Sequence, residues 1–143
     1  MNTKKMANQF KQRGVAAVEF ALIALIFFMI LIGVMEMSRV LFYMNTAGEV
    51  TRLGARLAVV CDVGDPIVET KMINMLNILT APDISVGYNP TGCTSDTCQS
   101  VTVSVTKSIN TFIPLVPLTF TMPSFSTTLP RESLNSATNP VCS

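Results

Sequence analysis

One uninterrupted apolar run dominates the hydrophobic pattern of this chain. Residues 15–35 read VAAVEFALIALIFFMILIGVM, which contains a single charged residue, Glu19, and no proline. A helix on the surface of a soluble protein has a polar face, and this run has none. About 20 apolar residues at 1.5 Å per residue cross the roughly 30 Å hydrocarbon layer of a bilayer. The pattern therefore predicts a membrane-spanning helix over residues 15–35.

Beyond this span the apolar pattern narrows to one stripe. Small or apolar residues recur at steps of three or four, while Glu49, Arg52 and Arg56 lie off the stripe. The stripe consists of Val40, Met44, Ala47, Val50, Gly54, Leu57 and Cys61. All eight prolines lie at residue 66 or later, so none interrupts a helix before that point. We expect one helix over residues 15–62, whose second half packs on a head formed by residues 63–143.

The head begins with residues typical of a helix start. Asp65 is placed to act as the N-cap and Pro66 as the first helical residue. We expect this second helix to continue to about Thr80. Its apolar face would consist of Val68, Met72, Met75, Leu76 and Leu79.

After residue 83 the composition changes to Ser, Thr, Pro and alternating valines, which is typical of strands. The pattern predicts strands over residues 84–88 and 100–108, with turn residues at 89–92 between them. Prolines 114, 117 and 123 favour edge or irregular structure over residues 109–122. A last strand is expected over residues 125–129, where Phe125, Thr127 and Leu129 alternate with the residues between them. The fold class is therefore α+β: a long N-terminal transmembrane helix, a short helix and a small antiparallel β-sheet head.

The composition narrows the possible functions. Apolar residues make up 49% of the chain and charged residues 13%, and histidine is absent. Without histidine, Ser-His-Asp triads and His-based zinc sites are excluded, and the glycines never fall at phosphate-binding spacings. We expect no enzyme, no cofactor, no metal and no small-molecule substrate.

The net charge of +1 conceals an asymmetry. Residues 1–14 contain four basic residues and no acidic one, whereas the remaining 129 carry a balance of −3. This distribution argues against a nucleic-acid partner. A basic flank beside an apolar span favours an N-terminus in the cytoplasm and a head on the opposite side of the membrane.

Three interpretations of residues 1–35 compete. A secretory signal peptide is disfavoured, because the apolar run is too long and is followed by Glu36-Met37-Ser38-Arg39 rather than by a small-residue cleavage site. A permanent anchor fits the length but leaves Glu19 unexplained, since an acidic side chain inside a bilayer costs on the order of 3 kcal/mol. In that case the carboxylate would lie near the interface, beside the basic flank of Lys11 and Arg13.

A prepilin-type leader is the third interpretation. Cleavage after Gly14 would make Val15 the first residue and Glu19 the fifth, a spacing that resembles the processing motif of type IV pilins. More closely, residues 13–60, RGVAAVEFALIALIFFMILIGVMEMSRVLFYMNTAGEVTRLGARLAVV, resemble the TadE-like family of minor pilins and pseudopilins of tight-adherence (Tad, Flp) pili. The match of Gly14, Glu19 and Phe20 in one register supports this interpretation. Residues 100–133 resemble the same family more weakly.

The resemblance implies a pilin-like protein of a Tad-type (type IVc) pilus, needed for pilus assembly, adhesion and surface colonisation. It implies four kinds of partner in addition to the membrane: a prepilin peptidase, the major pilin, other minor pilins and the inner-membrane assembly platform. Its location would be the bacterial inner membrane, with a periplasmic head that becomes extracellular after assembly. A permanently anchored protein with a periplasmic binding head and a secretion-system pseudopilin remain the alternatives.

Glu19 has a physical role in this interpretation. Cleavage frees an α-amine on Val15, whose pKa near 8 leaves it substantially cationic at neutral pH. In a bundle of helices, the Glu19 carboxylate of one subunit can pair with the amine of its neighbour, so that two otherwise costly buried charges neutralise each other. Pairing of this kind would set the register between subunits and couple processing to assembly.

Four cysteines, Cys61, Cys93, Cys98 and Cys142, lie on the predicted external side of the membrane, where disulfides persist. Four cysteines permit three connectivities. We favour Cys93–Cys98, which closes a short loop, and Cys61–Cys142, which joins the chain end to the base of the long helix. A zinc site of all four cysteines is the alternative, although the spacings lack paired C-x2-C knuckles.

Overall fold

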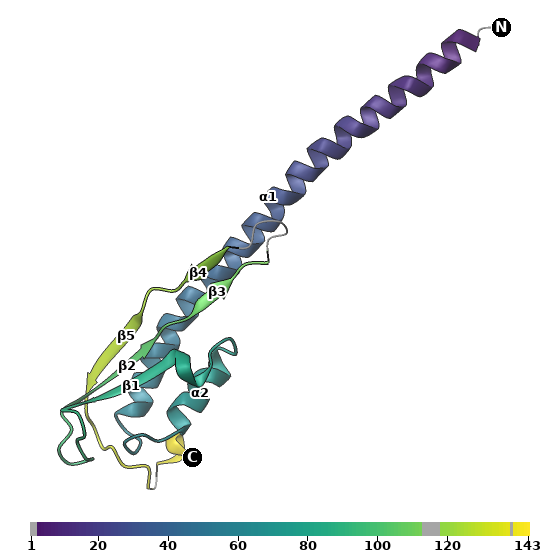
Figure 1. Ribbon diagram of the computed structural model, residues 1–143. Coiled ribbons are helices and arrows are strands. Elements are labelled where there is room, and N and C mark those ends of the chain that lie inside the picture. The colour runs from purple at the N-terminus through teal and green to yellow at the C-terminus, as the bar shows by residue number, and fades with distance from the viewer. Residues whose placement is uncertain (1–2, 113–117, 138) are drawn as a thin grey trace.

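A single long helix projects from a small head in the computed structural model, which describes residues 3–112, 118–137 and 139–143 (Figure 1). The helix α1, Thr3–Ala58, contains 56 residues. Within it, the stretch Gly14–Ala58 is long and apolar enough to cross a membrane, with a mean hydropathy of 2.9 in its most apolar window, and none of that window is buried against the head. This helix confirms the expected long apolar N-terminal element.

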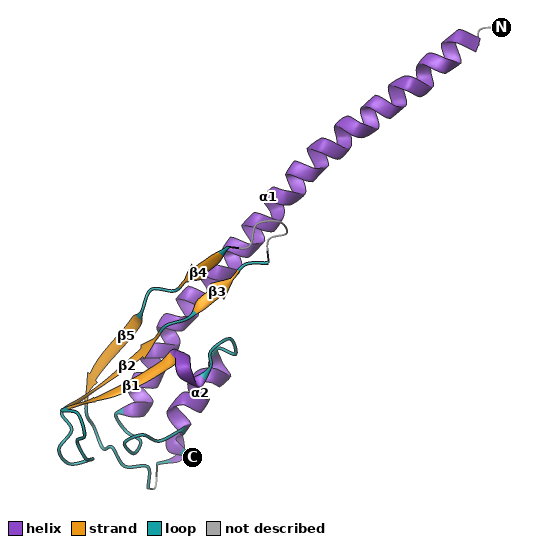
Figure 2. Cartoon of the chain, viewed as in Figure 1, coloured by secondary structure: helices purple, strands orange, loops and turns teal. Residues whose placement is uncertain are grey.

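The head combines a short helix with two antiparallel sheets, as Figure 2 shows. The larger sheet has the strand order β1-β2-β5, and the smaller pairs β3 with β4. The elements are α2 (Ile67–Met75), η1 (Ala81–Asp83), β1 (Ile84–Asn89), β2 (Ser100–Val105), β3 (Ser108–Asn110), β4 (Thr119–Thr121), β5 (Phe125–Pro130) and η2 (Pro140–Cys142). This arrangement confirms the α+β class.

The core lies between the second half of α1, the larger sheet and α2. The stripe predicted along α1 faces it: Ala47 and Val50 are fully buried. Cys61, expected as the last residue of the stripe, lies beyond the end of α1 at Ala58 and is fully buried as well. From the sheet, the alternating side chains Val101 and Val103 of β2 are fully buried as well. Because β2 is the central strand, its alternation places one whole row of valines against the helix.

The second helix is shorter than the sequence pattern indicates. It begins at Ile67 rather than at Pro66 and ends at Met75 rather than near Thr80, because Leu76 leaves the helical conformation (φ −135°, ψ 86°). Thr80 and Asp83 then form a reciprocal capping box that starts η1. The turn lets Leu76 and Leu79 both reach the core, while Met75, expected on the apolar face, is 48% exposed.

The strand predicted over residues 100–108 is divided in two. β2 ends at Val105, and β3 pairs with β4 instead of with the larger sheet. The division occurs where Lys107 Nζ forms a 2.6 Å salt bridge with Asp83 Oδ2 and the Thr106 amide donates to Asp83 O. The edge structure expected over residues 109–122 includes part of this hairpin, whereas Pro114 and Pro117 lie outside the described residues.

The C-terminal tail covers the end of α1. Val59 O accepts hydrogen bonds from the amides of Glu132 (3.1 Å) and Leu134 (3.2 Å), and Val60 O accepts from Asn135 (2.9 Å). Carbonyl groups at the end of a helix have no partner within the helix, so the tail satisfies them. Close by, the Ser136 hydroxyl donates to Asp65 (2.6 Å), which lowers the pKa of that carboxyl below its ordinary value.

Close contact between the two helices depends on Gly54. A Cβ atom at this position would lie 2.3 Å from Sδ and 3.1 Å from Cγ of Met72, a side chain that is fully buried. At Gly48, one and a half turns earlier, an added Cβ would meet only Phe125 Cδ1 at an ordinary 3.9 Å. Of these two glycines in α1, packing requires Gly54 and does not require Gly48.

We expect Gly54→Ala to destabilise the head by about 1–3 kcal/mol, because the buried Met72 has no free space to move into. Gly48→Ala serves as the matched control and should be neutral or stabilising by up to about 1 kcal/mol, since it removes a glycine from a helix without a clash. Thermal unfolding of both variants in detergent measures the difference. Equal stability of the two variants would contradict the close contact.

Candidate functional site

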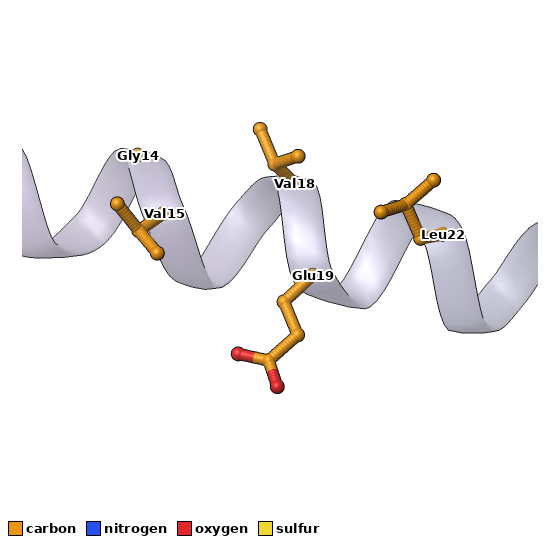
Figure 3. Close-up of a pocket in the computed structure, with 5 residues that line it drawn as sticks. All are labelled: Gly14, Val15, Val18, Glu19 and Leu22. Atoms are coloured by element: carbon orange, nitrogen blue, oxygen red, sulfur yellow. The ribbon is translucent and has the colours of Figure 1, made fainter.

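The residues singled out at the start of the apolar span lie on consecutive turns of α1. Gly14, Val15, Val18, Glu19 and Leu22 line a shallow, open surface on the helix. Figure 3 shows Glu19 projecting from the helix on the side opposite Val18 and Leu22. Val15 and Glu19 are four residues apart, and residues at this spacing are neighbours on a helix surface. Phe20 follows and is 73% exposed.

Glu19 is the charged residue of a surface that is otherwise apolar. Large apolar side chains from Val15 to Phe42 are exposed around α1. Among the described residues, no salt bridge involves Glu19. An apolar surface of this extent marks a site that contacts lipid or other protein. The carboxylate therefore lies where a cation brought by a neighbouring chain can reach it.

All four cysteines are in disulfides. Cys61 is bonded to Cys142, with 5.6 Å between their Cα atoms, and Cys93 to Cys98, with 4.9 Å. These are the two pairs that we favour from the sequence. The first bridge fixes η2 against the end of α1, far from the Glu19 end of the helix (Figure 1). The disulfides therefore shape the head, and the structure does not bring them near the residues of the apolar span.

A junction between α1 and the β3–β4 hairpin lies directly after the predicted span. Arg39 Nη2 donates to Glu36 Oε2 (2.7 Å) and to Asn110 O (3.0 Å). The Phe112 amide donates to the same Glu36 oxygen (3.2 Å). The Arg39 guanidinium also lies 5.8 Å from the centre of the Tyr43 ring, within cation–π range.

Sequence reasoning missed this junction. Glu36 and Arg39 are three residues apart, and from the sequence alone a pair at this spacing is a weakly stabilising exposed ion pair with no specific role. Their partners on the hairpin are 71 and 76 residues away in the chain and contribute backbone groups, which leave no signal in a side-chain pattern. The signal that the sequence did offer is the position of this pair, directly after the apolar span of residues 15–35. Charged side chains at that position can bind a segment of the head that packs against the helix.

A long apolar helix joined to a small disulfide-bonded α+β head defines a protein anchored in a membrane by one helix. Residues 14–56 match the family model of TadE-like proteins. The match begins at Gly14 and confirms the resemblance over these residues of α1. No curated protein and no solved structure gives a significant match.

We expect Glu36→Ala to loosen the hairpin from α1, because it removes the acceptor of the Phe112 amide and the partner of Arg39. Amide protection at residues 109–112 should therefore fall, most clearly at Phe112, whose amide donates to Glu36. Hydrogen exchange of the full chain in detergent measures this change.

Glu49→Ala is the matched control. Glu49 pairs with Arg52 at the same three-residue spacing and the same 2.7 Å distance, yet both side chains are mostly exposed. Its removal should leave exchange in the hairpin unchanged. A Glu36→Ala hairpin as protected as that of the control would show that the junction does not hold the hairpin.

Proposed function

We propose that this protein is a minor pilin or pseudopilin of a Tad-type pilus, made as a precursor and cleaved between Gly14 and Val15. The observation that carries the proposal is the position of Glu19, the one acidic residue in the exposed apolar span of residues 15–35, which lies within the match to the TadE-like family. In a permanent anchor that carboxylate would lie near the membrane interface, beside the basic flank of Lys11 and Arg13. A processed helix supplies a partner within the apolar bundle, the amine at residue 15 of the next subunit.

Processing would change both the charge and the chemistry of the helix end. It would remove the four basic residues of the leader and leave a side-chain balance of −3. It would also create a cationic amine four residues before Glu19. Nothing lies within 4 Å of an added Cβ at Gly14, and a glycine before the scissile bond would let a peptidase approach the backbone closely.

Assembly would move the apolar helix from lipid into a bundle of similar helices. The Leu, Ile and Phe side chains on the surface of the helix are shielded from water both in lipid and in the bundle, so the transfer exposes no apolar surface to water. The two charges decide the register, since an unpaired carboxylate in an apolar medium is costly and pairing with the neighbouring amine relieves that cost. The head stays outside the bundle, held by its own core and its disulfides.

The proposal includes the partners and the location that the family resemblance implies. The peptidase acts first, and the assembly platform, the major pilin and other minor pilins follow. The N-terminus lies in the cytoplasm, the head in the periplasm, and assembled subunits reach the cell surface, where pili serve adhesion. The two disulfides support an oxidising location for the head.

We expect the mature protein to begin at Val15. Intact mass and N-terminal sequencing of protein recovered from membranes of cells with an active prepilin peptidase should show the loss of residues 1–14. Gly14→Val should block this loss, because a branched side chain hinders approach to the scissile bond. Gly33→Val is the control, since Cβ atoms at both glycines meet nothing within 4 Å. A chain that still begins at Met1 would leave the permanent anchor as the function.

We further expect Glu19→Gln to insert into the membrane and to be processed normally, while its incorporation into pili falls sharply. The amide keeps the size of the side chain and removes the charge that pairs with the neighbouring amine. Quantification of the protein in sheared pili against that in membranes measures the effect. Ala17→Ser in the same segment should assemble normally. Incorporation of Glu19→Gln into pili at the wild-type level would refute the charge pairing. If the wild-type protein were found in a secretion complex instead of a pilus, the secretion-system pseudopilin would be favoured.

A further inference from the structure

The β3–β4 hairpin lies along α1 and is directed toward the N-terminal half of that helix (Figure 1). Its register pairs Asn110 with Thr119, and the Thr111 amide continues the ladder by donating to Leu118 O (2.9 Å). The chain therefore leaves the hairpin at Phe112 and returns at Leu118. We refer to these two residues as the hairpin end.

The junction with α1 fixes the height of the hairpin end relative to a membrane. Phe112 donates its amide to Glu36, which is the first residue after the apolar span of residues 15–35. That span measures about 31 Å at 1.5 Å per residue, close to the thickness of the hydrocarbon layer. When the span crosses a bilayer, the hairpin end is therefore level with the membrane surface.

The hairpin end exposes large apolar side chains, as a segment that contacts the membrane interface does. Phe112 is 85% exposed, more than any other large apolar side chain described, and Leu118 is 43% exposed. No charged residue occurs between Lys107 and Arg131 in the sequence, so nothing in this stretch opposes contact with lipid. Beside it, Glu36 and Arg39 form hydrogen bonds with each other and with two backbone groups of the hairpin.

We propose that the hairpin end is a lipid-contacting site, through which Phe112 and Leu118 enter the interfacial layer of the bilayer beside α1. Continuity with the membrane-spanning helix identifies the partner as lipid, because the exposed apolar surface of α1 leads directly to these two side chains. The head then meets the membrane at two points, the helix and the hairpin, and its orientation on the membrane is fixed. The inference requires the helix to span the membrane and does not depend on processing or on pilus assembly.

Tryptophan fluorescence tests the site directly, since the chain contains no tryptophan. The probe is full-length Phe112→Trp in phosphatidylcholine–phosphatidylglycerol vesicles, with and without brominated acyl chains. We expect a blue-shifted emission that loses intensity with brominated lipid and resists aqueous acrylamide. The substitution keeps an aromatic ring at an exposed position, so the fold is retained.

Two further variants make the result interpretable. Val141→Trp, 45% exposed in η2 at the far end of the head, should emit as in water and lose intensity with acrylamide. Ile26→Trp, in the middle of the span, should be quenched by brominated lipid and reports insertion of α1.

Each other outcome overturns the proposal. A Phe112→Trp signal like that of Val141→Trp would show that the hairpin end stays in water. A blue shift that grows with the protein-to-lipid ratio and is insensitive to brominated lipid would assign the site to a neighbouring copy of the chain. An unquenched Ile26→Trp would remove the membrane span itself, and with it the basis of the inference.

Discussion

The apolar surface of the first half of α1 determines how the rest of the molecule is built. Side chains exposed on all sides of a helix are stable only in lipid or among other apolar helices. The head therefore cannot use this part of the helix as its own core. Among the described residues, the hydrogen bonds between the head and α1 begin at Glu36, and the buried core begins at Val40. The first half of the helix therefore lies in an apolar medium and the second half in the core of the head. The Glu36–Arg39 pair marks the boundary between the two halves.

The second half of α1 acts as the central element of the head. The valines of β2 pack on its stripe, α2 packs across Gly54, and the C-terminal tail binds its last carbonyl groups. A head of about 80 residues buries a limited apolar area, and domains of this size commonly gain stability from disulfides. Here the two bridges lie in the part of the head farthest from the apolar half of α1 (Figure 1).

The elements that the sequence predicts correctly are those with a regular repeat of apolar positions. The unbroken apolar run and the stripe from Val40 to Cys61 predict α1 and its buried face, because a long helix averages its signal over many turns. The alternation of Val101, Val103 and Val105 predicts β2 in the same way. The family match over residues 14–56 agrees with the resemblance found in that region.

The elements that the sequence mispredicted depend on contacts between distant segments. The apolar face of α2 continues past Met75 in the pattern, but the capping box at Thr80 and the burial of Leu79 favour a turn. The strand after Ser100 ends early because Asp83 binds Lys107 and Thr106. The junction at Glu36 relies on backbone groups of Asn110 and Phe112. No local pattern records which backbone group a side chain will bind.

The Cys61–Cys142 bridge has a mechanical consequence. It closes residues 61–142 into a ring, and Cys61, where the ring closes, lies just after the end of α1. A pull on the C-terminus would therefore pass through the bridge to Cys61 and bypass the sheet. A cut in any loop of the ring leaves both pieces covalently attached to the anchor. The head therefore remains attached to α1 after a single cut of the chain that would release part of a head without this bridge.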